Sequence, residues 1–318
     1  MANERYLVVK EESEFGVAET PDKYIDILGE SLGYDPGVTP VETVFSRDIR
    51  KHVNLKALLS GDVDFNVEPE NVAHFFKWAL GSCTSEVIGE TTVYKHLFKP
   101  ADTLKSFTAI IAAVGEYPAG NFRKDSGCLV NGLHLESALD ILKGNITVVG
   151  AKEEKDATFT PTSPVPISAL DPFVFHQATL TLASADKSQY LRKLTLDIGN
   201  NIPTDDLYGH GSPNIRRAKV DRRTVGVELE MAFEDNTDYD KMLAGTEVAA
   251  DLHFLGPVAD DPEKYELKID LPKMIYKSGT AHIVGRDPLV VAMPCEVFYD
   301  SVSGYEVMIE LHNKVASY

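Results

Sequence analysis

The chain carries at residues 58–69 the stretch LLSGDVDFNVEP, in which apolar and polar side chains alternate before a helical pattern that ends at Gly81. A second stretch, VGVELEMAF at residues 225–233, leads into a shorter helical pattern that ends at Gly245. Three strand patterns follow each helix, and their centres Ile110, Leu135 and Val148 are expected to correspond to Ile269, Val297 and Ile309. One unit used twice in tandem is therefore predicted.

The division of the chain supports this reading. The net charge of −18 splits equally, since residues 1–160 and 161–318 each sum to −9. A segment rich in Pro and Thr has the composition of a linker and lies near the midpoint. We predict a first module at residues 1–156, a linker at 157–171 and a second module at 172–318.

Most of the chain has the pattern of strands. Alternation with a period of two is clear at residues 194–198, 225–233, 267–271 and 307–311, as expected for sheets with one face on a core. The predicted fold class is mainly β: sandwich or barrel modules, each with one flanking α-helix.

Composition excludes several classes of protein. No stretch approaches the roughly 20 apolar residues that span a bilayer, and the first residues lack the pattern of a signal peptide. Cys83, Cys128 and Cys295 are too far apart to indicate a zinc site or a disulfide framework. The acidic balance argues against tight binding of nucleic acid.

Short motifs suggest chemistry that their surroundings do not support. Residues 29–33, GESLG, match a nucleophile elbow around Ser31, but the turn sequence that follows leaves no room for the helix that an elbow needs. Residues 235–240, DNTDYD, lack the glycine of a calcium loop. His134 and His210 have no ligand partner at metal-binding spacing. We therefore predict no catalytic, cofactor-binding or metal-binding residues, and no enzyme.

Two long loops, residues 19–43 and 200–214, are expected to serve as arms, since loops of this length are usually functional or disordered. A basic cluster follows each loop. Such clusters could bind nucleic acid, but on an acidic molecule they are better explained as partners for acidic surfaces of neighbouring subunits. The candidate inter-subunit contacts are Arg47, Arg50, Arg216, Arg217, Arg222 and Arg223.

Taken together, several motifs in order along the chain resemble those of phage tail tube proteins, the major tail proteins of long-tailed phages, and specifically their large two-module type. The motifs are EFGVAETP at residues 14–21, FKWALG at 76–81, SFTAI at 106–110, GCLVNGLHL at 127–135, IGNN at 198–201, VDRRTVG at 220–226 and LHN at 311–313.

The resemblance implies a structural virion protein without catalytic residues. It implies a tail in which subunits polymerise into stacked rings around a conduit for genome DNA. Because single modules of this family form sixfold rings, a doubled module implies trimeric, pseudo-hexameric rings, with hexameric rings as the alternative. The implied partners are the tape measure, tail terminator and tail tip proteins, with assembly in the host cytoplasm and no membrane.

DNA must slide through such a tube without tight binding, so an acidic wall is expected. The matching strand stretches of the two halves supply the candidate lumen-facing residues Asp62, Asp64, Glu228 and Glu230.

Two other functions remain open at this point. One is a β-sandwich protein that binds carbohydrate or a host surface, for which the single tryptophan, Trp78, offers little stacking area. The other is an esterase built on Ser31, which the lack of alternating strands and helices disfavours.

Overall fold

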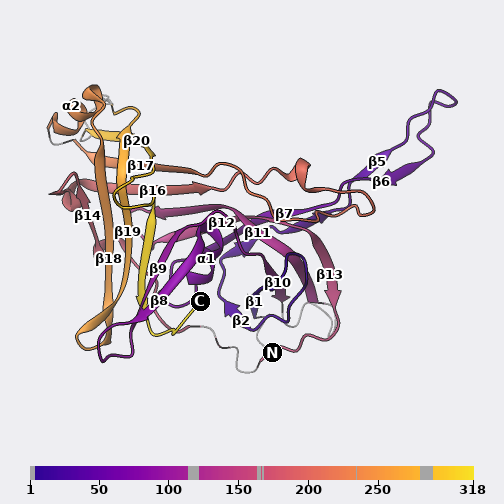
Figure 1. Cartoon of the computed structure of the whole chain (residues 1–318), viewed down its shortest axis with the longest axis horizontal. Helices are drawn as coiled ribbons and strands as arrows, with labels where there is room; N and C mark the ends of the chain where they lie inside the picture. The colour runs from indigo at the N-terminus through magenta and orange to yellow at the C-terminus, as the bar shows by residue number, and fades with distance from the viewer. Residues whose placement is uncertain (1–3, 114–121, 163–165, 167, 234, 280–288) are drawn as a thin grey trace.

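The computed structural model describes residues 4–113, 122–162, 166, 168–233, 235–279 and 289–318. Antiparallel strands form most of it, and each half carries one helix, α1 (Ala73–Leu80) or α2 (Thr237–Ala244), among these residues (Figure 1). The prediction of a mainly β chain with one helix in each half is confirmed.

The first half contains one long strand, β11 (Phe122–Ser137), that takes part in two sheets. The strands of the first half are β1 (Arg5–Glu11), β2 (Lys23–Ile25), β3 (Gly29–Glu30), β4 (Gly33–Asp35), β5 (Val38–Pro40), β6 (His52–Asn54), β7 (Leu58–Asn66), β8 (Gly81–Val87), β9 (Tyr94–Pro100), β10 (Phe107–Ala113), β11 (Phe122–Ser137), β12 (Lys143–Gly150) and β13 (Lys152–Asp156). The N-terminal part of β11 lies in the order β2-β1-β10-β11-β13. Its C-terminal part pairs with β12, which pairs with β7, and β3 and β4 pair with β7.

The second half also contains one long strand shared by two sheets. Its strands are β14 (Ala178–Leu182), β15 (Ala185–Asp186), β16 (Leu191–Gly199), β17 (Thr224–Ala232), β18 (Val248–Asp260), β19 (Glu263–Tyr276), β20 (Val290–Val297) and β21 (Met308–Asn313), with 3-10 turns η1 (Phe175–Gln177), η2 (Ser188–Tyr190) and η3 (Thr204–Leu207). The pairing order is β15-β14-β18-β19-β21 for the N-terminal part of β19. Its C-terminal part pairs with β20, then β17, then β16.

The two pairing orders coincide strand for strand, with β1 answering to β14, β7 to β17, β11 to β19, β12 to β20 and β13 to β21. The strand correspondences that we expected from the sequence are wrong by one strand. Leu135 lies in β11, whereas Val297 lies in β20, the counterpart of β12. The counterparts expected for Ile110 and Val148, Ile269 and Ile309, likewise lie one strand too late.

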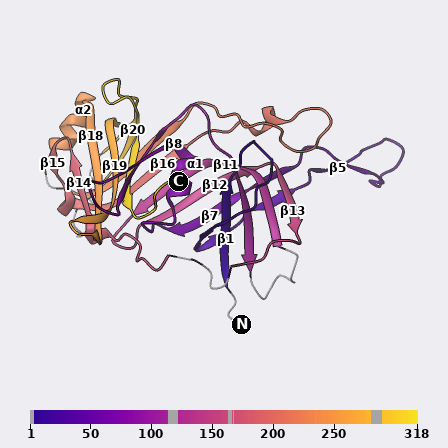
Figure 2. The same cartoon turned by 60° about the horizontal axis from the view of Figure 1, so that its bottom comes forward.

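The hairpin β8–β9 explains the error. It follows α1 directly, whereas α2 leads into β18 after a few residues, so an equal offset along the chain matches the wrong strands beyond the helix. The hairpin also connects the halves, because β9 pairs with β21. The view in Figure 2 shows the second-half strands β18, β19 and β20 beside the first-half strands around α1.

One hydrophobic core runs through both halves. Gly81 closes α1 in the left-handed conformation, as predicted, and Gly245 closes α2 in the same way. Trp78 is 1% exposed and lies flat on Phe107, with ring centroids 4.2 Å apart. Burial of each side chain of this size contributes about 1.5–3 kcal/mol, so α1 is fixed firmly over the sheets.

The two loops expected to serve as arms, residues 19–43 and 200–214, behave differently. Most of the first loop is not an arm, because β2 pairs with β1 and because β3 and β4 pair with β7. Only its end, from β5 onward, projects. β5 and β6 form a separate two-stranded hairpin that projects far from the body of the molecule (Figure 1). Residues 200–223 instead lie against the first half, where Ile202, Leu207 and Ile215 are 7%, 1% and 4% exposed. In the single subunit this second loop is therefore not a projecting arm, since its apolar side chains are already covered.

Candidate functional site

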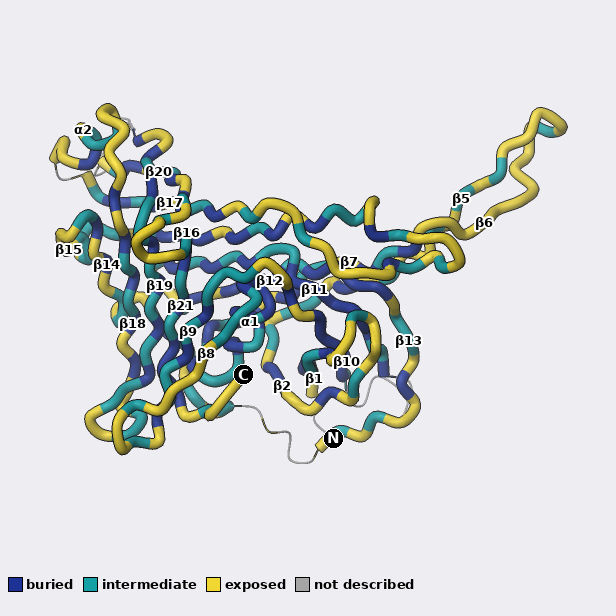
Figure 3. Tube along the Cα trace, viewed as in Figure 1, coloured by how far each residue is buried: buried dark blue, intermediate teal, exposed yellow. Residues whose placement is uncertain are grey.

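The largest sheet joins the halves and presents one polar face. Its strands lie in the order β7-β12-β11-β16-β17-β20, and the junction between the halves is the pairing of β11 with β16. Alternate side chains of each strand enter the core, so the others point away from it, as the alternating colours along the strands in Figure 3 show. We call the side that faces away from the core the open face.

The register aligns the open face in rows across all six strands. One row runs from Asp64 through Asn145, His134, Asp197 and Gly226 to Glu296. Such rows place residues from both halves within about 5 Å of their cross-strand neighbours. The open face is therefore one continuous surface.

Carboxylates dominate the open face. Lys143 and Lys193 are its lysines, and they face seven acidic residues, namely Asp62, Asp64, Glu136, Asp197, Glu228, Glu230 and Glu296. Lys193 pairs with Glu136 at 2.7 Å, and this hydrogen bond, with the nearby charges of Glu228 and Glu230, raises the pKa of Lys193. The open face is acidic overall, because these seven carboxylates outnumber its two lysines and Lys277, which lies 3.5 Å from Glu296.

Short polar contacts hold several of these side chains in place. Asn145 Nδ2 donates to Asp64 Oδ1 at 2.8 Å, and Thr147 Oγ1 donates to Asp62 Oδ1 at 2.7 Å. Across the junction between the halves, His134 Nδ1 lies 2.6 Å from Asp197 Oδ1.

All four predicted lumen-facing residues lie on the open face. Asp62 and Asp64 come from β7, and Glu228 and Glu230 come from β17, the counterpart of β7 in the pairing order. The acidic residues of the strands between β7 and β17 were not predicted, although His134 and Asp197 lie in the stretches 127–135 and 194–198 that showed strand patterns or family motifs.

The predicted inter-subunit arginines are spread over several places. Arg47 and Arg50 are exposed at the tip of the β5–β6 hairpin, where the Arg50 guanidinium lies 5.4 Å from the centre of the Phe45 ring. Arg216, Arg217 and Arg222 are exposed on the 200–223 segment. Arg223 is held within the chain, which follows from its contacts with Glu306 at 3.2 Å and the Ala101 carbonyl at 2.8 Å.

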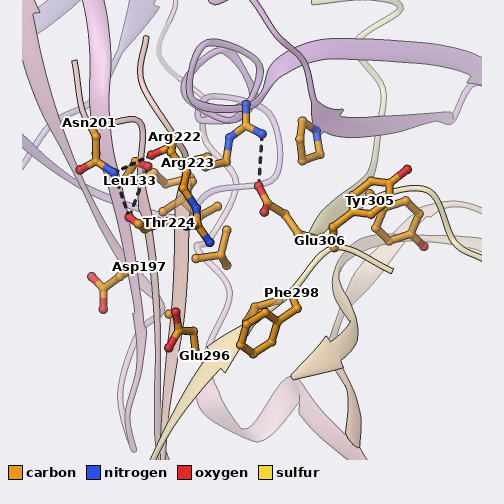
Figure 4. A pocket seen from close by; sticks show the side chains of 18 of the residues that line it. Leu133, Asp197, Asn201, Arg222, Arg223, Thr224, Glu296, Phe298, Tyr305 and Glu306 are labelled. Atoms are coloured by element: carbon orange, nitrogen blue, oxygen red, sulfur yellow. Dashed lines mark hydrogen bonds and ion pairs between the residues drawn. The ribbon is translucent and has the colours of Figure 1, made fainter. Parts of the chain in front are cut away.

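A hollow of about 1070 Å³ lies on the open face at the junction of the halves, lined by Asn131 and His134 of β11 as well as by Gly226 of β17 and Glu296 of β20. Figure 4 shows Asp197 and Glu296 on its sheet side and Phe298, Tyr305 and Glu306 on its other side. The hollow is thus part polar and part aromatic.

The other chemical candidates have structural roles. Ser31 Oγ accepts a hydrogen bond from the Asp62 amide at 2.9 Å, in a turn that leads to β4 rather than to a helix. Trp78 is buried and unavailable for stacking on a ligand. The Asp235 carboxylate accepts from the Thr237 amide at 2.8 Å at the start of α2, where Asn236 is the N-cap residue.

Among the described residues, one group of side chains has the spacing of a metal site, although the sequence did not predict one. Ligand atoms of Glu266, Glu310 and His312 lie within 4.8 Å of one another on β19 and β21. His312 Nε2 is 2.8 Å from Glu310 and Nδ1 is 3.5 Å from Glu266, so the group also makes sense as a set of ion pairs.

Comparison with known families decides the identity. The family model described as phage tail tube protein matches residues 2–297, which is nearly the whole chain. The chain belongs to the phage tail tube family. It is therefore a structural protein of the virion tail, and the resemblance drawn from the sequence is confirmed. No curated protein matches the chain.

Membership of a structural family agrees with a site that offers shape and charge rather than a catalytic group. In the described part of the tail tube protein, no helix is both long and apolar enough to cross a membrane.

Proposed function

We propose that this tail tube protein polymerises into stacked rings whose open faces line a channel through which genome DNA passes during ejection. The acidic open face, continuous across both halves, is the observation that carries the proposal. Duplex DNA carries one negative charge per roughly 1.7 Å of axis, and a basic wall would hold it through counterion release. An acidic wall repels DNA and lets it slide.

Ring stoichiometry follows from the repeated pairing order. We infer that the chain is one module used twice, with boundaries at 1–156, 157–171 and 172–318. Two modules in each chain favour three chains in a pseudo-sixfold ring over six. Support comes from the β11–β16 junction, which joins the two halves into one sheet.

The same junction is a model for the contact between copies. β16 is the counterpart of β3 and β4, and β11 is the counterpart of β19. A neighbouring copy would then add the C-terminal part of its β19 to the outer edge of β3 and β4. Closing the ring in this way gives the open edge at β3 and β4 a partner.

Other tail components are expected at the ends of the tube and within it. We propose the tape measure protein in the channel before ejection, with terminator and tip proteins on the end rings and assembly in the host cytoplasm. The contact between stacked rings is heterologous and does not close, so stacking continues until another protein stops it.

Negative-stain electron microscopy of the concentrated protein tests the polymerisation. Hollow filaments or stacked rings are expected. Particles that remain single at every concentration, including in the presence of tail tip complexes as an initiator, would contradict the proposal.

A further inference from the structure

We propose that His312 and Glu266, supported by Glu310, bind a divalent metal ion, for which Zn²⁺ is the best fit. The ligand atoms of these three residues lie within 4.8 Å of one another. They belong to β19 and β21, in a sheet other than the one that carries the open face. The site is therefore separate from the proposed channel wall and goes beyond the tube function.

Cross-strand pairing brings the three side chains together. Glu266 of β19 lies directly opposite His312 of β21, and Glu310 lies two residues before His312, on the same side of the sheet. Residues directly opposite each other have Cβ atoms about 5 Å apart. The backbone of the sheet, rather than a loop, therefore sets where each of these groups lies, and this favours a precise site.

His312 is placed between two carboxylates. It is 9% exposed, its Nε2 lies 2.8 Å from Glu310 Oε1, and its Nδ1 lies 3.5 Å from Glu266 Oε2. A neutral imidazole has a single N–H and so can donate to only one of the two carboxylates. In either tautomer the other nitrogen turns a lone pair toward an anion. The arrangement therefore calls for one further positive charge.

Nδ1 is the nitrogen of His312 that lacks a partner. It is buried without a hydrogen bond, whereas Nε2 is hydrogen-bonded to Glu310. Buried polar atoms of native proteins nearly always have a partner. A metal ion bound to Nδ1 supplies one, and the Glu310 carboxylate then orients the ring, as carboxylates commonly do for metal-bound histidines.

A second imidazole lies on the other side of Glu266. His253 Nε2, from β18, lies 2.9 Å from Glu266 Oε1, yet it too is buried without a hydrogen bond, because the geometry at this nitrogen does not suit one. Two ring nitrogens without partners thus flank the same carboxylate. His253 is the side chain best placed to become a third ligand.

The spacing and the atom types suit zinc. Two ligand atoms bound at about 2.1 Å to a tetrahedral Zn²⁺ ion lie about 3.4 Å apart. The 3.5 Å between His312 Nδ1 and Glu266 Oε2 is close to this value. Imidazole nitrogens together with a carboxylate oxygen favour Zn²⁺ over Mg²⁺ and Ca²⁺, which prefer oxygen ligands.

The nearby lysines leave the negative charge of the site for another cation. Lys95 Nζ lies 3.1 Å from Glu86, and Lys268 Nζ lies 2.7 Å from Asp251, so each lysine is paired with a carboxylate outside the site. The Glu266 side chain is 21% exposed, so an ion from solution can reach it.

A bound ion would tie together strands that connect the halves. β21 pairs with β19 on one side and with β9 of the first half on the other. An ion held between β19 and β21 would therefore stabilise the sheet on which the β8–β9 hairpin is mounted. Ions that bind only the folded chain raise its stability by mass action.

Isothermal titration calorimetry with ZnCl₂ tests the site in the full chain, freed of metal with EDTA beforehand. We expect one Zn²⁺ per chain and at least tenfold weaker binding to His312→Gln, which lacks the imidazole. Glu266→Gln keeps the shape of its side chain and should weaken binding to a similar degree. The control His210→Gln removes an exposed histidine outside the site and should bind Zn²⁺ like the wild type.

Two further measurements report on the same site. Co²⁺, whose visible absorption depends on its coordination, should give a tetrahedral spectrum with the wild type and with His210→Gln, but not with His312→Gln. Zn²⁺ at a hundredfold excess over its dissociation constant should raise the thermal midpoint of the wild type by about 4 °C. No binding of Zn²⁺ to the wild type, or equal binding to the wild type and His312→Gln, would overturn the metal site and leave the tube proposal standing.

Discussion

His134 Nδ1 lies 2.6 Å from Asp197 Oδ1, across the line where β11 of the first half pairs with β16 of the second. This pair sits in the middle of the acidic row that runs from Asp64 to Glu296. The junction therefore joins two halves into one polar surface and leaves no break between them. The proposed channel wall depends on that continuity.

Reversing the charge of the open face should slow DNA movement. Replacing Asp62, Asp64, Glu228 and Glu230 together with Lys gives each subunit four cations in place of four anions on the proposed channel wall. We expect rings to assemble but DNA release from reconstituted virions to slow at least tenfold, since phosphate contacts would form at every ring. Release is measured by fluorescence of a DNA-binding dye.

The matched control reverses four exposed carboxylates outside the open face, namely Glu14, Glu90, Asp171 and Asp261. This variant changes the net charge equally and should release DNA at the normal rate. Equal slowing in both variants would mean that total charge, rather than the open face, matters.

The tip of the β5–β6 hairpin should be needed for assembly but not for folding. Phe45 is 82% exposed, so Phe45→Ser removes little buried area in the single subunit and should shift its thermal midpoint by no more than about 1 °C. Sedimentation should show that filament formation is lost, because clustered apolar side chains on a projecting hairpin usually mark a contact surface. Val302→Ser, at a site 92% exposed outside the hairpin, is the control and should polymerise normally.

Asn200 should contribute strongly to stability. Its Nδ2 donates to the carbonyls of Ala79 and Val130, each at 2.9 Å, and the residue is 2% exposed. Asn200→Ala leaves both carbonyls buried without this donor and should cost about 2–4 kcal/mol in urea unfolding. Asn145→Ala, which removes one exposed hydrogen bond, should cost less than about 1 kcal/mol; equal losses would contradict the account.

Asp125 should make stability depend on pH. Burial raises the pKa of its carboxyl to about 7, opposed by the charge of Arg123 and assisted by the charges of Glu153 and Glu30. An unfolded aspartate titrates near pH ~3.9, so the folded chain binds this proton more tightly. The stabilisation is complete below about pH 4 and is lost as the pH rises toward 7.

Replacing this carboxyl by an amide removes the titration. Asp125→Asn should flatten the free energy of unfolding between pH 4.5 and 7.5, over which the wild type should lose about 2–4 kcal/mol. Asp64→Asn, at an exposed site, should keep the wild-type profile. A slope that persists in Asp125→Asn would assign the pH dependence to other groups.

The sequence predicted the strands, the helices and the polar face because their signals are local. Alternation places the side chains of Asp62 and Glu228 on the face of the sheet opposite to those of Val63 and Leu229. Each helix ends at a glycine because the residue there adopts the left-handed conformation. The order of pairing is not local. Because hairpin β8–β9 follows only the first helix, an equal offset along the chain pairs Leu135 of β11 with Val297 of β20, although these strands hold different places in the two pairing orders.

Contacts between distant segments also could not be predicted from the sequence. Nothing local distinguishes the covered Ile215 from the exposed Ile49, because their difference depends on whether another half lies beside the loop. The grouping of Glu266 with His312 likewise depends on the pairing of β19 with β21.

Electron cryomicroscopy of the assembled tube tests the central claim most directly. We predict three chains in each ring, with the open faces turned inward and Asp62, Asp64, Glu228 and Glu230 lining the channel. A ring of six chains would contradict the repeated module, and a reconstruction with these four carboxylates on the outer surface would contradict the acidic channel.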